Sequence, residues 1–233
     1  MCFVLADNGP VFLATLDSKE CAELDRLGRS QSYRAGDVIM RQGDPPDFLL
    51  IIETGVVQIV SNDPYGSQVV LGLYGAGDIV GEIAVIDKKV RSATAKALTN
   101  VKVSVISATS MNAFLDKHPW VMKSLLITLS NRLRKSTLQL NTIVGQTVDE
   151  RLVKLLLDYA DRFCPASTQK LVIPLSQQDL ADMVGASREA VVKALRDLRK
   201  KGLIETARKQ VVLLNVERLR TVDRSEITFG IST

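Results

Sequence analysis

The spacing of hydrophobic residues changes along the 233-residue chain. Between residues 32 and 107, short runs rich in Val, Ile and Leu alternate with turn signals such as Ala35-Gly36-Asp37 and Gln42-Gly43-Asp44. Several short strands separated by close turns are typical of an all-β sandwich or barrel. The buried strands are expected at residues 49–52, 56–60 and 69–73.

From residue 119 the apolar spacing becomes that of a helix. Steps of three and four residues connect Leu126, Leu129, Leu133, Ser136, Leu140 and Ile143. This is the a/d spacing of a heptad repeat, in which Ser136 is the polar exception. We call these positions the heptad seam. Such a seam predicts a parallel homodimer, and the simpler alternative is a helix that packs on its own β-domain.

Gly145 interrupts this helix, and a new helix is expected to start at Thr147 or Asp149. We therefore expect a hinge at residues 145–149 and two domains, residues 1–147 and 148–233. The first domain holds the strands and the long dimerisation helix. With a largely helical second domain, the chain is assigned to the α+β class.

The second domain carries the signals of a helix-turn-helix. Ser176 and Asp179 have the spacing of a capping box, which begins a helix. Gly185 fits the turn, and Ser187 begins a second helix. Residues 203–214 then predict a hairpin, which makes the motif a winged helix-turn-helix. Helix pairs with this spacing also occur in proteins that do not bind DNA.

Positive charge is concentrated on the same motif. Residues 187–209 hold eight basic and three acidic side chains, a net charge of +5, whereas the whole chain has +4. This charge would meet the phosphates of a duplex. Arg and Lys can donate to guanine, and Glu can accept from cytosine. The predicted DNA-contacting residues are Ser176, Gln178, Ser187, Arg188, Glu189, Lys193 and Lys209, while Arg196, Arg199 and Lys200 are expected to meet phosphates or water.

The most specific motif is Gly81-Glu82-Ile83-Ala84, followed by Arg91-Ser92-Ala93. A plain interpretation is a surface turn with a Glu–Arg ion pair. The segment 81–95 also closely resembles the phosphate-binding cassette of cyclic nucleotide-binding domains. Together with the winged helix, it makes residues 29–214 similar to the Crp/Fnr family of bacterial transcription regulators. The resemblance implies an N-terminal jelly-roll, or β-roll, a long dimerisation helix and a C-terminal winged helix-turn-helix.

The resemblance also implies a ligand pocket. A cyclic phosphate could bind Arg91 through charge-assisted hydrogen bonds, with Ser92 beside it. Glu82 would accept from the ribose 2′-hydroxyl, and the purine would contact Ser136 and Thr137, one of them from each subunit. The implied pocket residues are Gly81, Glu82, Ile83, Ala84, Arg91, Ser92, Ser136 and Thr137. Cyclic AMP is favoured and cyclic GMP is the alternative, because a hydroxyl both donates and accepts.

The amino-acid composition and the motifs that are missing exclude several classes of function. The single histidine, His118, excludes a His-rich metal site, and three distant cysteines exclude a disulfide framework. A helix-entry or packing role is expected for His118. The sequence has no nucleophile elbow, no phosphate-binding loop and no apolar stretch that could span a membrane. We therefore expect no enzyme, metal or cofactor.

The expected protein is a cytoplasmic homodimer that binds a pseudo-palindromic DNA site once a cyclic nucleotide shifts it to a DNA-competent state. RNA polymerase is a further expected partner. The alternatives are an interaction module whose helix-turn-helix binds protein, and a family member with another effector. Residues 217–233 are expected to form a short helix and a frayed tail, without an assigned function.

Overall fold

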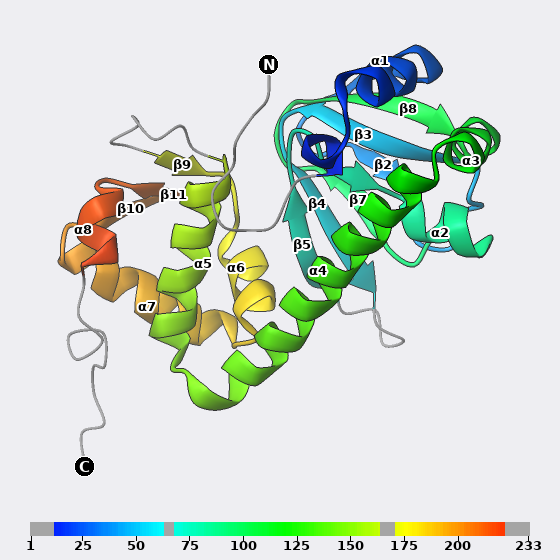
Figure 1. Ribbon diagram of the computed structural model, residues 1–233. Coiled ribbons are helices and arrows are strands. Elements are labelled where there is room, and N and C mark those ends of the chain that lie inside the picture. The colour runs from blue at the N-terminus through cyan, green and yellow to red at the C-terminus, as the bar shows by residue number, and fades with distance from the viewer. Residues whose placement is uncertain (1–11, 63–67, 164–170, 222–233) are drawn as a thin grey trace. The chain divides into compact units, whose positions relative to one another are not determined.

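The computed structural model describes residues 12–62, 68–163 and 171–221, without the side chains of residues 138–144 (Figure 1). Packing divides the chain into two compact units between Arg134 and Lys135, and each unit is described by itself. The division falls inside the long helix. The sequence places the domain boundary after residue 147, where that helix has ended, and this boundary stays a prediction.

The first unit is built around two antiparallel sheets. In the described residues their strand orders are β1-β8-β3-β6 and β2-β7-β4-β5. The runs expected as buried strands fall on β3, β4 and β5, and the predicted all-β architecture is confirmed. The strands are β1 (Arg29–Tyr33), β2 (Val38–Met40), β3 (Phe48–Thr54), β4 (Val57–Asn62), β5 (Gln68–Tyr74), β6 (Ile79–Val80), β7 (Thr94–Ala97) and β8 (Val101–Ser107).

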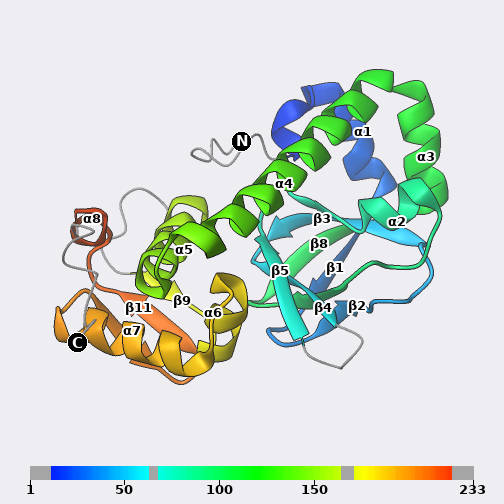
Figure 2. The ribbon, with the colours of Figure 1, turned by 90° about the horizontal axis from the view of Figure 1, so that it is seen from below.

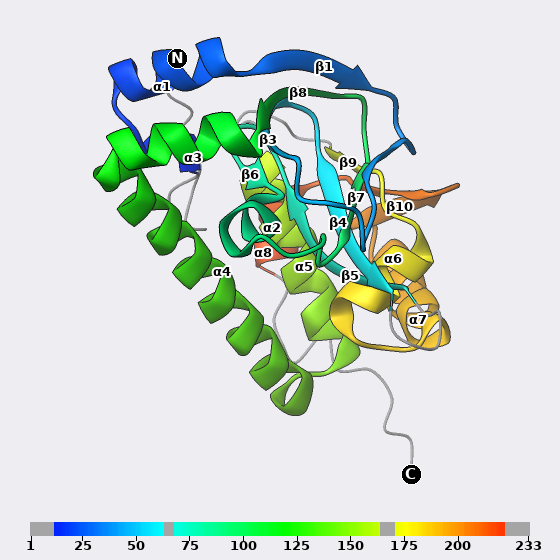
Figure 3. The ribbon, with the colours of Figure 1, turned by 90° about the vertical axis from the view of Figure 1, so that its right-hand side faces the viewer.

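Strand β3 is apolar on both faces because each face meets a separate core. Leu49 and Ile51 pack in a cluster with helical residues such as Phe114, whereas Leu50 and Ile52 pack among residues of both sheets. This alternation follows from the two-residue period of a strand. The helical side is made by η1 (Phe12–Thr15), α1 (Ser18–Leu27), α3 (Ala108–Lys117) and the start of α4 (Pro119–Gly145). Figure 3 shows α1, α3 and α4 together.

His118 lies at the corner between α3 and α4. Its Nε2 is 3.0 Å from the Glu23 carboxylate of α1, and its ring packs against Phe114 with the ring centroids 4.5 Å apart. Pro119 then begins α4. The histidine therefore joins three helices by packing, which is the helix-entry role expected from the sequence.

Helix α4 has two distinct apolar faces. Val121 and Leu125 are buried in the core of the first unit. Of the heptad seam, by contrast, Leu126 and Leu133 are 57% and 70% exposed, and Ser136 is exposed. Leu129 is half-buried, and the side chains of Leu140 and Ile143 lie outside the described residues. The residues that pack α4 on its own β-roll are therefore not those of the seam.

The second unit is a small helical domain with one sheet of order β10-β11-β9 in its described part. Helices α6 and α7 pack on each other, with the sheet beside them (Figure 2). This arrangement confirms the winged helix-turn-helix. The elements are α5 (Val148–Phe163), β9 (Leu171–Ile173), α6 (Gln177–Val184), α7 (Arg188–Lys200), β10 (Ile204–Ala207), β11 (Gln210–Leu213) and α8 (Val216–Arg220).

The predicted helix break is present between Gly145, which ends α4, and Val148, which begins α5. The Thr147 amide donates to the Glu150 carboxylate over 2.9 Å, so α5 starts with its own cap. Near the C-terminus, α8 is the short helix expected after residue 217, and the predicted tail beyond residue 221 lies outside the described residues.

Membrane-spanning helices and metal clusters are both absent from the described ranges. Within them, no helix is long and apolar enough to cross a membrane. The same residues contain no group of three or more His, Cys, Asp or Glu side chains that could hold a metal ion.

Candidate ligand pocket and nucleic-acid interface

The cassette begins with a sharp turn after strand β6. Gly81 has φ +88°, which favours glycine, and precedes helix α2 (Glu82–Asp87). A Cβ at this position would lie 2.9 Å from Arg91 Nη1. The backbone conformation therefore favours glycine here, and a larger residue would also displace the end of the Arg91 side chain.

Arg91 is 2% exposed and is held by backbone carbonyls. Its Nη1 donates to the Gly81 carbonyl over 2.9 Å and its Nη2 to the Phe48 carbonyl, while the guanidinium lies 4.9 Å from the centroid of the Phe48 ring. The buried Nε has no hydrogen-bond partner in the structure. Burial lowers the pKa of Arg91, and Asp47, Asp44 and Glu82 raise it.

Within the part of the chain that the structure describes, this environment leaves a buried cation without a carboxylate in direct contact. An arginine remains protonated under these conditions, and an oxyanion is the ligand that its planar donors fit best. The arrangement therefore fits an anion such as a phosphate diester, and its role as a binding site stays a prediction.

Glu82 is the second buried charge of the cassette, with 2% exposure. It accepts a 2.6 Å hydrogen bond from Arg132 Nη1 of α4, and Nη2 of the same arginine donates to the Ile79 carbonyl over 2.7 Å. The Arg132 guanidinium lies 4.4 Å from the centroid of the Tyr74 ring. Burial raises the pKa of Glu82, and Arg132 opposes that rise.

The plain interpretation of the cassette as a surface turn is thus corrected. Glu82 does form a Glu–Arg ion pair, but the arginine comes from α4, and the pair is largely buried. The sequence missed Arg132 as a pocket residue. The pattern that could have revealed Arg132 is the buried stripe of α4. In this stripe Val121, Leu125 and Thr128 precede Arg132 in steps of three and four residues.

The structure gathers some predicted pocket residues and not others. Gly81, Glu82 and Arg91 lie together with Arg132. Ala84 is buried, Ile83 is 47% exposed, and Ser92 is exposed with no hydrogen bond in the described residues. Ser136 and Thr137 are exposed residues of the second unit. The ligand-contact roles of all these residues stay predictions.

The helix-turn-helix is stabilised by local caps. The Ser176 hydroxyl accepts from the Asp179 amide over 3.1 Å, and the Asp179 carboxylate accepts from the Ser176 amide over 2.8 Å. Gly185 has φ +61° at the turn, and the Ser187 hydroxyl accepts from the Ala190 amide over 3.2 Å at the start of α7. These caps confirm the local structure predicted there, and they commit the hydroxyl of Ser176 to its own helix.

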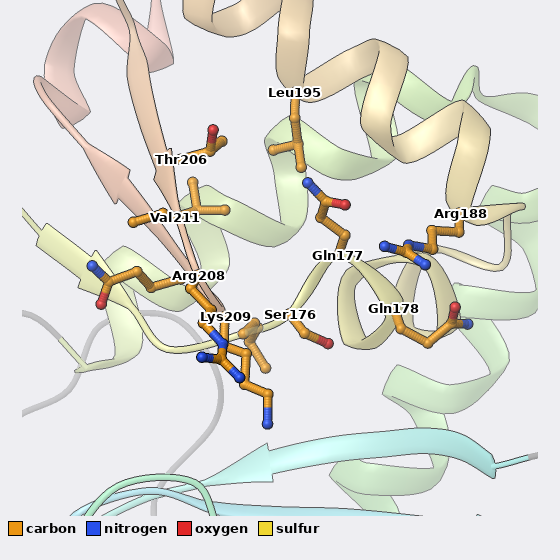
Figure 4. Close-up of a pocket in the computed structure, with 12 residues that line it drawn as sticks. Ser176, Gln177, Gln178, Arg188, Leu195, Thr206, Arg208, Lys209 and Val211 are labelled. Carbon is orange, nitrogen blue, oxygen red and sulfur yellow. The ribbon is translucent and has the colours of Figure 1, made fainter.

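A cationic concave surface lies between the wing and the two helices. The cavity has a volume of about 400 Å³, and no acidic residue is among those that line it. Figure 4 shows Arg208 and Lys209 extending from the wing tip near Ser176, with Arg188 beside Gln178. Lys209 has φ +55° in the two-residue turn between β10 and β11. Positive side chains that converge in this way fit a phosphodiester backbone.

Helix α7 presents its remaining charges on the side opposite its core. Val191, Ala194, Leu195 and Leu198 are buried. The charged residues of the outer side are exposed: Arg188, Glu189, Lys193, Arg196, Arg199 and Lys200. The predicted base-contacting residues are therefore accessible, with Glu189 and Lys193 one helical turn apart.

Comparison with known proteins agrees with this class of ligand-binding, DNA-binding protein. Residues 30–118 match the cyclic nucleotide-binding domain, and residues 150–222 match the Crp-like helix-turn-helix domain. The chain belongs to the Crp/Fnr family of transcription regulators.

Its similarity to individual relatives extends over most of the chain. It is 32% identical to the CRP-like cAMP-activated global transcriptional regulator of Mycobacterium tuberculosis, over 85% of this chain and 89% of that protein. It is 27% identical to the cAMP-activated global transcriptional regulator Vfr of Pseudomonas aeruginosa, over 78% and 87%. The solved structure of the c-di-GMP responsive regulator CLP of Xanthomonas campestris has a TM-score of 0.72 at 25% identity, covering 84% of this chain and 99% of that chain.

Proposed function

We propose that this protein is a cyclic AMP-responsive transcription regulator that acts as a homodimer in the cytoplasm. The observation that carries the proposal is the buried Arg91: among the described residues its Nε has no hydrogen-bond partner, and its Nη1 and Nη2 donate to carbonyl oxygens. A cyclic phosphate would supply the missing anion. The relatives named as cyclic AMP-activated support this choice of effector.

Glu82 would select a ribonucleotide. Its carboxylate would accept from the 2′-hydroxyl, and the ion pair with Arg132 favours the ionised form of Glu82 against the effect of burial. Ser136 and Thr137 would complete the site at the purine. Calorimetry of the full-length protein with cyclic AMP, cyclic GMP and c-di-GMP tests the effector, and cyclic AMP is expected to bind most tightly. Tightest binding of c-di-GMP, to which the Xanthomonas regulator CLP responds, would favour the alternative of another effector.

The heptad seam supports the homodimer. Leu126 and Leu133 are exposed in the single chain although they follow a heptad, and burying them against a second copy would remove their apolar surface from water. A two-fold dimer presents two α7 helices, which fits a pseudo-palindromic DNA site. RNA polymerase is the further proposed partner of a regulator bound beside a promoter.

Binding of the cyclic nucleotide would shift the population of the protein toward its DNA-competent state. A ligand changes an equilibrium only by binding one state more tightly than the other. Helix α4 carries Arg132, the partner of Glu82, and continues across the division between the two units. A ligand that changes this ion pair would act directly on α4, with residues 145–149 as the hinge. A gel shift with and without cyclic AMP separates this function from that of a module that binds protein.

Replacing Glu189 with alanine should relax DNA specificity at one base pair. Glu189 is exposed near the start of α7, where its carboxylate can accept from cytosine N4, and such a contact is worth about 1–3 kcal/mol. Binding is measured with a set of single-base variants of the DNA site. An equal loss for every sequence would show instead that Glu189 only positions the helix.

Replacing Lys200 with alanine should weaken all duplexes alike. Lys200 lies at the end of α7 and its side chain is 72% exposed, with Asp197 as a distant partner at 3.7 Å. The loss of one phosphate contact makes the negative slope of log affinity against log salt shallower by about 0.9. Titrations at several salt concentrations measure this slope, and an effect confined to one base pair would contradict the assignment.

A further inference from the structure

The loop between β2 and β3, residues 41–47, lies directly against Arg91 of the cassette. Two main-chain hydrogen bonds of 2.9 Å join them, from the Gly43 amide to the Arg91 carbonyl and from the Arg91 amide to the Asp44 carbonyl. The Arg91 side chain also contacts the end of this loop, because its Nη2 donates to the carbonyl of Phe48, the first residue of β3. The β2–β3 loop therefore forms part of the surroundings of the buried guanidinium.

The β2–β3 loop carries two acidic residues, Asp44 and Asp47, beside the predicted anion site. Burial lowers the pKa of Arg91, and Asp47, Asp44 and Glu82 raise it, Asp47 the most. Glu82 is paired with Arg132, whereas neither aspartate forms an ion pair within the described ranges. The two aspartates are therefore the uncompensated negative charges next to Arg91.

The two aspartates differ in what else they do. The Asp44 carboxylate accepts a 2.9 Å hydrogen bond from the Arg41 amide and so closes the turn at Gly43, which has φ +89°. Asp47 holds the loop only through its backbone, since its carbonyl accepts from the Ala108 amide over 2.8 Å. Its side chain is exposed and makes no hydrogen bond in the described part of the chain. The charge of Asp47 is therefore not needed to keep the loop in place.

This charge distribution treats the first and the second negative charge of a ligand differently. A cyclic phosphate has one negative charge, and Arg91 can meet it with charge-assisted hydrogen bonds. A phosphate monoester has close to two charges above pH 7. The group of Arg91, Asp44 and Asp47 has a net charge of −1, so the second charge of a monoester is repelled.

We propose that Asp47, together with Asp44, makes the ligand site selective for a phosphate with a single negative charge. The ligand class is a phosphodiester. AMP, which differs from cyclic AMP by an opened ring and a second charge, is disfavoured. This inference rests on the proposed function, the binding of a cyclic nucleotide at Arg91. It adds a specificity-determining residue that lies outside the cassette.

Three adenine nucleotides test the proposal: cyclic AMP, AMP, and the methyl ester of AMP, which has an open ring like AMP but one charge. Their affinities for the full-length protein are measured by competition with a fluorescent cyclic AMP analogue at about pH 8, where AMP is a dianion. For the native protein, the methyl ester is expected to bind more weakly than cyclic AMP and more tightly than AMP.

The variant Asp47→Asn gives the decisive comparison. Coulomb energy is proportional to the charge of the ligand, so the gain in affinity for a dianion should be the square of the gain for a monoanion. Loss of one exposed charge should improve binding of cyclic AMP and of the methyl ester about threefold, and binding of AMP about ninefold. Equal gains for AMP and its methyl ester, or no gain, would overturn the proposal.

Matched variants separate charge from structure. Asp47→Glu keeps the charge and should keep the native ratio of affinities. Asp37→Asn is the control, because Asp37 is an exposed aspartate that accepts from the Arg34 amide in a similar turn, and it should change nothing. Thermal melts verify that each variant is folded. If the native protein bound none of the nucleotides, the proposed function itself would be wrong. If it bound cyclic AMP but Asp47→Asn left the selectivity unchanged, only this inference would be wrong.

Discussion

Replacing Arg91 with alanine is expected to lower the affinity for cyclic AMP by about 100-fold or more, because several charge-assisted hydrogen bonds to the phosphate are lost together. Arg91 is the buried cation of the cassette, and its Nε has no hydrogen-bond partner in the described residues. Calorimetry with the full-length protein measures the loss.

The variant also removes two structural hydrogen bonds, those to the Gly81 and Phe48 carbonyls. A thermal melt must therefore show that Arg91→Ala is folded. Arg91→Lys keeps the charge but not the planar pair of donors, and it should bind more weakly than the native protein and more tightly than the alanine variant. Lys89→Ala, at an exposed residue of the same cassette, is the control and should bind normally. If folded Arg91→Ala bound cyclic AMP with native affinity, residues 81–95 would not be the phosphate-binding cassette.

Features that depend on residues close together in the chain were predictable from the sequence. The capping box at Ser176 and Asp179 and the left-handed Gly185 place α6 and its turn. The uninterrupted apolar run at residues 49–52 places β3. The motif around Gly81 was also found, since a glycine before Glu82 and an arginine ten residues later form a short, local pattern. Each of these signals involves neighbours in the chain.

Features that depend on packing between distant segments were not predicted. Glu82 and Arg132 are 50 residues apart, and only the packing of α4 on the β-roll brings them together. In the sequence of α4 the heptad seam is the more regular pattern, so the second, buried stripe of the same helix was not recognised.

Replacing Arg132 with alanine is expected to destabilise the protein by about 3 kcal/mol, because it leaves the buried Glu82 carboxylate without its ionic partner. Urea denaturation measures the free energy of unfolding. Arg134→Ala is the matched control: it removes an exposed arginine two residues along the same helix and should have little effect.

The loss of folding stability in Arg132→Ala should depend on pH in a defined direction. Burial already raises the pKa of Glu82, and removing Arg132, which lowers it, raises this pKa further. The folded variant then holds a proton that the unfolded chain releases, so its stability falls as pH rises from the unfolded pKa of Glu82 to its raised folded pKa. Above about pH 4.5, the ordinary pKa of a glutamate, the fall should therefore be steeper than in the native protein.

A double variant separates the charge from the packing. Adding Glu82→Gln to Arg132→Ala removes the buried negative charge, so part of the stability should return and the extra pH dependence should disappear. If the loss came only from the missing contact between Arg132 and the Tyr74 ring, Glu82→Gln would restore nothing and Arg132→Ala would follow the native pH profile. That outcome would show that Glu82 is not the reason why α4 carries a half-buried arginine at this position.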